Sequence, residues 1–480
     1  MHQAWVRVVL VMASAMAGPQ ALASDIVRAV RESGLAGPTI WPNRVLEYAD
    51  AQVHPDKPLR LMQVWQAARV NDPSLRAARA GLAAARERLP QARSQVLPQV
   101  QLGVSRVRND LTRGGQSAQG QSLTVFDRYP GANETVTLRQ PVVRAQQLIG
   151  IRQAQSAERE ADAVFAREDQ EFSARVVMAY LEVLLAHDNV RLVDSQREFL
   201  ESALVSATRG VAAGVGTRTD VDAAQAKVDL NRAQALQVQQ QFDFARRQLQ
   251  SMINRPFVAL VPLDGNKLAT IGLDHRSLED WIREAEAGSP EIQRLEAQRQ
   301  ALADELNKAR AAHLPTLDVV AQIQRSRSEN TLSPQSQFEN RSLGLQLNVP
   351  LYNGGYVNSL VRQASAEVER AEETLAAARL ELGLKVHREY RGVSEGLVRI
   401  KALEVAVRSS EVALDSARRS VTAGVRTQVD VLNAEQQLSE ARRNLNEARY
   451  GLLGSLARLH TVAGTNGETL VQRIDQVLAH

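Results

Sequence analysis

The side chains that most often do chemistry are sparse in this chain. Its 480 residues include no cysteine, which excludes disulfides, thiol catalysis, cysteine-bound zinc and a lipid anchor on cysteine. The eight histidines lie far apart and form no pair at metal-ligand spacing, so no metal site is expected. No Ser/His/Asp set, P-loop or glycine-rich nucleotide motif is present. An enzyme is therefore the weakest interpretation, and no cofactor is expected.

The best candidates for a functional role lie in a motif that occurs twice. Gly214-Val-Gly-Thr-Arg-Thr-Asp220-Val221 recurs as Gly424-Val-Arg-Thr-Gln-Val-Asp430-Val431, 210 residues later. Each copy interrupts a long alanine-rich helical pattern, and glycine suits the left-handed residue that ends a helix. Gly214 and Gly424 are therefore predicted as helix-tip turns. The threonines Thr219 and Thr427, or the residues beside them, are predicted to begin the return helices by capping exposed N–H groups.

Other repeats show that the duplication extends well beyond the tip motif. Asp72-Pro73 and Leu97-Pro98 recur as Ser289-Pro290 and Leu314-Pro315, each 217 residues later. Two tandem copies of one mostly helical unit of about 210 residues are typical of a narrow class of architecture. The predicted copies are residues 59–254 and 289–463, with an equatorial connector at 255–288.

The two ends of the chain lie outside the repeats. Residues 1–23 are predicted as a signal peptide, because Arg7 precedes an apolar run that ends in small residues at Ala21-Leu-Ala23. Residues 24–58 carry four prolines and no periodicity, and are predicted as an irregular extension. Residues 464–480 are predicted as a C-terminal tail.

The helices that position the repeated motif have a coiled-coil pattern. Apolar residues step by three and four along three stretches, which is the spacing of a helix–helix seam, and alanine recurs at alternate seam positions. From Ile151 to Val211 an uninterrupted helix would extend for about 90 Å. Such a helix suits a long tubular molecule. The three seams are Phe172, Val176, Ala179, Val183, Ala186, Val190 and Val193; Val361, Ala364, Val368, Ala371, Leu375, Ala378 and Leu382; and Val431, Ala434, Leu438, Ala441, Leu445, Ala448 and Leu452.

Four stretches alternate apolar and polar residues and are predicted as strands. They form one pair at about 97–110 and 134–143 and another at about 314–326 and 341–350, with segments 109–134 and 326–341 as hairpin loops. Each strand has one apolar face and one polar face. Four strands cannot close a barrel, since the smallest barrels need about eight. Entry into a membrane would therefore require several chains to pool their strands, and the alternative is a soluble β-layer. The polar face includes Gln101, Asp318, Gln322, Gln346 and Asn348.

Composition agrees with thin helical packing. Aromatic residues make up 4% and charged residues 23% of the chain, whose net charge is +4. Arginine and glutamate alternate along the helical patterns without a basic block. This is typical of solvated helix faces, so no nucleic-acid partner is expected.

Together these motifs resemble the TolC family of outer-membrane efflux proteins, over about residues 59–463. The resemblance implies a fold that is mainly α with a small β part. It also implies a homotrimer whose twelve strands form one barrel in outer-membrane lipid, continued by a long periplasmic α-helical barrel that coiled helices close. The segments that carry it are Leu61-Met-Gln-Val-Trp-Gln-Ala-Ala-Arg, Asn71-Asp-Pro-Ser-Leu-Arg, Leu97-Pro-Gln-Val, Leu314-Pro-Thr-Leu, Val349-Pro-Leu-Tyr-Asn-Gly-Gly and the two tip motifs.

The joint at Leu351-Tyr-Asn-Gly-Gly355, with Asn358-Ser359 and the segment after it, most resembles the type I secretion members of this family. Those members export polypeptides such as RTX toxins, adhesins or proteases with an inner-membrane ABC transporter and a periplasmic adaptor. The outer component of a drug or metal efflux pump, working with a proton-driven pump, is an alternative because a duct does not read its cargo. A periplasmic coiled-coil scaffold is the alternative from another class.

The resemblance also assigns roles at the tips. Asp430 matches a position that contributes a ring of carboxylates at the constricted periplasmic entrance. The next ring position is Asn433, so half of the expected charge is missing, and Val421 replaces a tyrosine that makes a closing hydrogen bond. Arg426 matches a residue that holds the entrance shut, with Asp220 as its partner. The alternative is that Asp220 only caps a helix and Asp430 is only a solvated carboxylate.

Overall fold

The computed structural model describes residues 58–116, 120, 122–214, 216–273, 276–330 and 333–479. The predicted signal peptide, and the predicted extension apart from Pro58, lie outside these residues. The described chain divides into two compact units. A β unit contains residues 91–148 and 310–357, and a helical unit contains residues 58–90, 149–309 and 358–479. Each unit therefore takes part of its chain from both sequence repeats.

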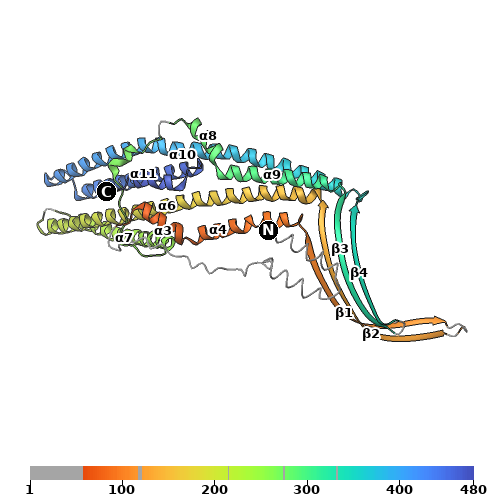
Figure 1. Cartoon of the computed structure of the whole chain (residues 1–480). Coiled ribbons are helices and arrows are strands. Elements are labelled where there is room, and N and C mark those ends of the chain that lie inside the picture. The colour runs from red at the N-terminus through yellow and green to blue at the C-terminus, as the bar shows by residue number, and fades with distance from the viewer. Residues whose placement is uncertain are drawn as a thin grey trace. The chain divides into compact units, whose positions relative to one another are not determined.

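In both halves of the chain, shorter helices precede a pair of strands, and a very long helix and a shorter return helix follow it (Figure 1). Their bounds are α3 (Leu61–Asn71), α4 (Pro73–Arg86), α5 (Arg88–Ser94), α6 (Ala145–Ala212), α7 (Arg218–Ile253), α8 (Leu278–Gly288), α9 (Pro290–Ala311), α10 (Tyr356–Thr422), α11 (Gln428–Val462) and α12 (Gly467–Asp475), with a 3-10 turn η1 (Gly265–Thr270) in the connector. The 68 residues of α6 extend for about 100 Å at the usual helical rise. Among the described residues, no helix is both long and apolar enough to cross a bilayer.

The predicted seams are the buried stripes of these long helices. Six of the seven seam residues of α6 are buried, and Val190 is half-buried. In α11 the larger residues are buried at every seventh position, while the alanines between them are half-buried. Each long helix packs against the helix that follows it. Asn231 Nδ2 of α7 donates to the Val193 carbonyl of α6 (3.3 Å), and Arg442 of α11 forms an ion pair with Glu411 of α10 (2.8 Å).

Asp72 and Pro73 separate the first two helices of the described chain. The carboxylate of Asp72 accepts hydrogen bonds from the backbone N–H groups of Ser74 (2.8 Å) and Leu75 (3.0 Å), and Pro73 fills the first position of α4. Proline and an aspartate cap favour a new helix start. Residues 61–94 are divided among the three short helices α3, α4 and α5.

The predicted C-terminal tail is a packed part of the helical unit. Leu470 and Ile474 of α12 are buried in the main hydrophobic core, and Leu478 forms an isolated antiparallel bridge with Leu263 of the connector. Leu59 forms a parallel bridge with Leu260 of the same connector. The connector therefore ties both ends of the described chain to the core.

The β unit is one antiparallel sheet with strand order β1-β2-β3-β4. Its strands are β1 (Gln99–Gln116), β2 (Ser122–Val143), β3 (Thr316–Asn330) and β4 (Ser333–Asn348). They continue through most of the segments 109–134 and 326–341, which were predicted as loops. Alternation of side chains marks a strand with an apolar face, whereas backbone pairing needs no such alternation. The strands are therefore longer than predicted at their hairpin ends.

The register places the apolar residues of all four strands on one face. Val100, Leu138, Ala321 and Leu343 form one row across the sheet, since each lies opposite the next. Because directly opposed residues share a face, the rows before and after this one share it too. Leu343, Leu345 and Leu347 of β4 are exposed by 72%, 73% and 64% in the single chain. The sheet thus presents a large apolar face that this chain alone does not cover.

The other face of the sheet is polar, as predicted. Gln324 Nε2 donates to Asn133 Oδ1 across β2 and β3 (3.2 Å). Asp318 also belongs to this face but is buried, because Arg139 Nε (2.8 Å) and Arg144 Nε (2.9 Å) donate to its carboxylate. Its charge is paired with two guanidinium groups inside the chain.

Candidate functional site: the helix tips

The two repeated motifs fold as the same turn. Gly214 has φ of 73° and Gly424 has φ of 74°, a left-handed conformation that residues with a Cβ rarely adopt. Gly424 N–H donates to the Val421 carbonyl (3.0 Å), and Val425 N–H reaches back to the Ser420 carbonyl (2.9 Å). These two bonds satisfy the last carbonyls of α10, as in the Schellman motif. The glycines therefore reverse the chain at the ends of α6 and α10.

Both return helices begin with the same pair of residues, a threonine followed three positions later by an aspartate. Thr217 N–H (3.1 Å) and hydroxyl (2.6 Å) donate to Asp220 Oδ2 at the start of α7. Thr427 N–H (3.0 Å) and hydroxyl (2.9 Å) donate to Asp430 Oδ2 at the start of α11. The N-cap of α7 is thus Thr217 rather than the predicted Thr219. A Thr-x-x-Asp spacing repeated at an interval of 210 residues was the signal that could have identified it.

The electrostatics of the second tip keep Asp430 ionised. The Thr427 backbone N–H and hydroxyl, together with the positive charge of Arg426, hold the pKa of the Asp430 carboxyl below its ordinary value. Arg426 and Asn433 are exposed, and Asp430 is half-buried. A half-buried carboxylate that stays charged can attract cations from water.

The predicted pair between Arg426 and Asp220 is not formed within one chain. Among the described residues, Asp220 bonds to its own cap residue, Thr217, and no ion pair joins it to Arg426.

A joint that the sequence did not reveal connects the two helix pairs near the tips. Leu432 of α11 is buried with Leu200 of α6 and Val228 of α7. The ring of Phe199 packs against this cluster and also against the cluster between α10 and α11, and the guanidinium of Arg418 lies 4.9 Å from the ring centroid. The two pairs are thus held together by an apolar contact and a cation–π contact.

A polar groove lies beside this joint. It has a volume of about 550 Å³ and is lined from α6, α7 and α11. Its walls include the glutamines Gln196, Gln234 and Gln436 and the arginine Arg443. Such a surface offers many hydrogen-bond donors and acceptors but no arrangement of nucleophile and base.

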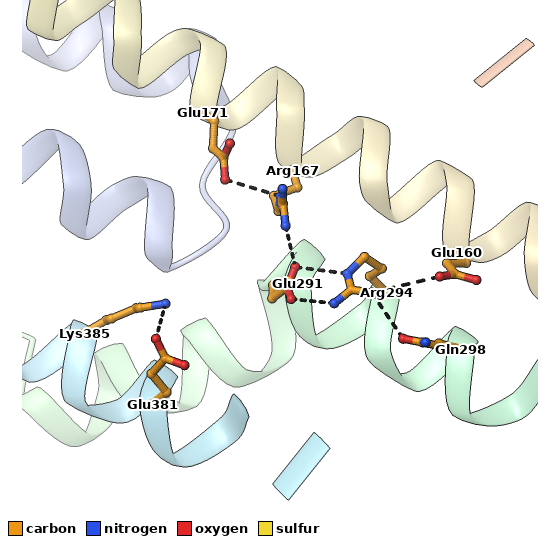
Figure 2. Close-up of polar contacts among 8 residues, drawn as sticks. All are labelled: Glu160, Arg167, Glu171, Glu291, Arg294, Gln298, Glu381 and Lys385. Carbon is orange, nitrogen blue, oxygen red and sulfur yellow. Dashed lines mark hydrogen bonds and ion pairs between the residues drawn. The ribbon is translucent and has the colours of Figure 1, made fainter. Parts of the chain in front are cut away.

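A second charged cluster lies in the body of the helical unit, where α6 meets α9 (Figure 2). Glu291 accepts from Arg167 (3.0 Å) and from Arg294 (2.7 Å), and Arg294 also approaches Glu160 at 4.0 Å. The hydrogen bonds from Arg294, then those from Arg167, lower the pKa of the Glu291 carboxyl. Every charge in this cluster has an opposite partner, so it joins the first repeat to the second rather than forming a reactive site.

Long paired helices with charged tip turns, joined by the chain to a sheet with one apolar and one polar face, are the architecture of TolC-like outer-membrane channels. The family model described as outer membrane efflux protein matches residues 64–255 and 281–465. The chain belongs to this family and is an outer-membrane channel component. The two matched segments correspond to the two sequence repeats.

Named relatives cover most of the chain. It is 31% identical over 358 residues to the proteases secretion protein PrtF of Dickeya chrysanthemi, which spans 73% of this chain and 76% of the relative. It is 30% identical over 356 residues to the alkaline protease secretion protein AprF of Pseudomonas aeruginosa, with 73% of each chain covered. Identity to the outer membrane protein TolC of Escherichia coli is 26%, over 73% of this chain and 71% of the relative. These names describe transport components.

Solved structures share the fold at lower identity. The outer-membrane channel OprN aligns with a TM-score of 0.70 at 17% identity, over 85% of this chain and 90% of its own. The outer membrane protein VceC of Vibrio cholerae aligns with a TM-score of 0.70 at 19% identity, over 85% of this chain and 96% of its own.

Proposed function

We propose that the chain is the outer-membrane duct of a type I secretion system, which exports polypeptides together with an inner-membrane ABC transporter and a periplasmic adaptor. The cargo class is inferred from the relatives PrtF and AprF, whose names assign them to protease secretion. The observation that supports a membrane-spanning duct is the sheet with two different faces. Its apolar face is exposed, and its opposite face is polar.

The order of the strands supports assembly of several chains, and the family implies three. β1 and β4 are the edges of the sheet, so each has a row of backbone groups unpaired within one chain. Such edges cannot remain open in lipid, where every unsatisfied backbone group costs several kcal/mol. Pairing β1 of one chain with β4 of the next satisfies both edges. Three chains then contribute twelve strands around a water-filled lumen lined by the polar face.

The same threefold arrangement would bring the helix tips together at the periplasmic entrance. Three copies of Asp430 would form a ring of negative charge there, and Asn433 would add polarity without charge. Arg426 would reach Asp220 of a neighbouring chain, since the two do not meet within one chain. Gly214 and Gly424 would shape the turns that carry these residues.

A second candidate is the outer component of a drug or metal efflux pump. The family description and the similarity to TolC favour it. A periplasmic scaffold is disfavoured by the exposed leucines of β4, since a contiguous apolar face in water promotes aggregation.

Two measurements test this proposal. A heat-labile trimer is expected in outer-membrane extracts, and a monodisperse soluble monomer would contradict the duct. Deletion of the gene should then abolish export of a polypeptide in the host while leaving drug and metal tolerance unchanged. Loss of tolerance with normal polypeptide export would instead establish the pump component.

A further inference from the structure

The apolar face of the sheet ends in arginine on three of its four strands. The row Leu102, Val136, Ile323 and Arg341 is the last one that is mainly apolar. The next row is Val104, Glu134, Arg325 and Glu339, and the row after it is Arg106, Ala132, Arg327 and Gln337. Arg108 follows on β1. Because opposed residues share a face, these arginines project from the same face as the leucines.

The arginine border, formed by Arg106, Arg108, Arg325, Arg327 and Arg341, lies at the hairpin ends of the strands. β1 turns into β2 after Gln116, and β3 turns into β4 after Asn330, whereas the opposite strand ends connect to helices. If the helices lie in the periplasm, as in the proposed duct on which this inference rests, the hairpin ends face the outer leaflet. The rise along β4 from Leu347 to Arg341 is about 20 Å, and the rise along β3 from Leu317 to Arg325 is about 27 Å. Both lengths are comparable with the apolar band of a membrane barrel, which is about 25 Å tall.

The arginines of this border differ in how far they are neutralised. Glu339 accepts from Arg325 (3.2 Å) and Arg341 (2.7 Å), and Glu134 lies opposite Arg325 in the register. Within the described residues, no carboxylate pairs with Arg106, Arg108 or Arg327. Arg106 and Arg327 are exposed and flank Ala132 in one row. Two strand spacings of about 4.8 Å separate their backbones, so both guanidinium groups can reach one anion above the small alanine.

We propose that Arg106 and Arg327, with Ala132 between them and Arg108 beside them, bind a phosphate group of an outer-leaflet lipid. Guanidinium groups bind phosphate with two parallel hydrogen bonds, and the adjoining leucines would contact the acyl chains of the same lipid. Membrane-barrel bands are usually bordered by aromatic residues, which suit any interface. An arginine border instead selects anionic headgroups, and phosphorylated saccharolipids supply them at this depth.

The test is native mass spectrometry of the purified full-length trimer with a bis-phosphorylated disaccharide lipid and with its dephosphorylated form. The wild-type trimer is expected to bind the phosphorylated lipid with about 25-fold higher affinity than the Arg106→Gln/Arg327→Gln variant does. Each arginine is expected to contribute about fivefold to this difference. Ala132→Glu, which places a carboxylate between the arginines, should weaken binding to a similar extent. Arg113→Gln is the matched control, because Arg113 lies on the opposite face of β1 and its loss should leave binding unchanged.

Several results would overturn the site. Equal binding of the phosphorylated and dephosphorylated lipids by the wild-type trimer would mean that only the apolar face is recognised, and this arm needs no variant to fold. Competition by inorganic phosphate at equal concentration would point to a free-anion site. Unchanged binding in the double variant would remove the assigned arginines. Failure of the wild-type chain to insert into vesicles of neutral lipid would instead contradict the proposed duct, which separates the two failures.

Discussion

Replacing Leu345 by arginine tests whether the leucine face of β4 meets lipid. Leu345 lies at the middle of three exposed leucines and opposite Val319 of β3. Its side chain is 73% exposed in the single chain, so a longer side chain meets no steric barrier there. An arginine at mid-bilayer depth costs about 2–4 kcal/mol. Three chains would raise this cost to about 6–12 kcal/mol for each trimer.

Gln346→Arg is the matched control, since Gln346 lies on the polar face of the same strand. Gln346 is exposed and lies opposite Asp318, whose carboxylate is already bound by Arg139 and Arg144, so the new guanidinium would extend into water. Leu345→Phe keeps the apolar character and should assemble normally. The assay is the amount of heat-labile trimer in outer-membrane extracts, followed by denaturant titration of the protein in vesicles. We expect Leu345→Arg to lose most of its trimer and the two controls to keep theirs.

Two outcomes would refute this reasoning. Equal loss in Leu345→Arg and Gln346→Arg would show that the facing assignment is wrong. A change below about 0.5 kcal/mol in Leu345→Arg is the value expected for an exposed position in water, and it would show that the sheet does not enter lipid.

Three further predictions concern the helical unit. Arg426→Ser should raise single-channel conductance in planar bilayers, because it removes a charged donor that can bridge helices of neighbouring chains; unchanged conductance would leave Arg426 as a solvated charge. Thr217→Val should cost about 1 kcal/mol of stability by removing the cap of α7, whereas Thr219→Val should cost little, and the reverse order would contradict the assigned cap. Glu291→Gln and Glu435→Gln should show opposite pH dependence in thermal unfolding followed by circular dichroism. The lowered pKa of Glu291 stabilises the fold above the ordinary value of 4.5, and this stability is lost as pH falls through the folded pKa. Burial raises the pKa of Glu435, so Glu435→Gln should stabilise at neutral pH and lose that gain as pH falls towards 4.5; parallel curves would count against both assignments.

The helical framework could be predicted because its signals are local and repeated. The three-and-four spacing of apolar residues persists over many turns, and the tip glycines interrupt it at the same place in both repeats. The predicted helix from Ile151 to Val211 is α6, which begins six residues earlier. The face of each strand could also be assigned, because side chains alternate wherever one face is apolar.

Other features depend on contacts that no local pattern encodes. The joint of Phe199 and Arg418 brings together residues that lie far apart in sequence, and it depends on the rotation of α6 and α10 about their axes. The ends of the strands depend on backbone pairing alone, since the polar ribbon beyond Arg106 has no apolar face to alternate. The C-terminal helix α12 is hard to predict for another reason. Its apolar residues have helical spacing, but its 9 residues are too few for the periodicity to be distinctive.

The sequence leaves Asp430 as either a solvated carboxylate or a member of a charged ring, and the structure adds the role of a helix cap. The geometry makes the cap and the ring compatible. Both bonds from Thr427 end on Oδ2 of the Asp430 carboxylate, and within the described residues no bond reaches Oδ1. One oxygen can therefore stabilise the start of α11 while the other remains available to the proposed ring of charge. The cap also fixes the direction of the side chain, which a ring of charges requires.

Two substitutions separate these roles. Asp430→Asn keeps an oxygen that can accept the bonds from Thr427 but removes the charge, so it should preserve thermal stability and reduce cation preference in planar-bilayer recordings. Thr427→Val removes a donor to the cap but keeps the charge, so it should lower stability by about 1 kcal/mol and largely retain cation preference. If Asp430→Asn conducted cations like the wild type, Asp430 would act only as a cap, because its loss of charge would then have no effect on ions at the entrance.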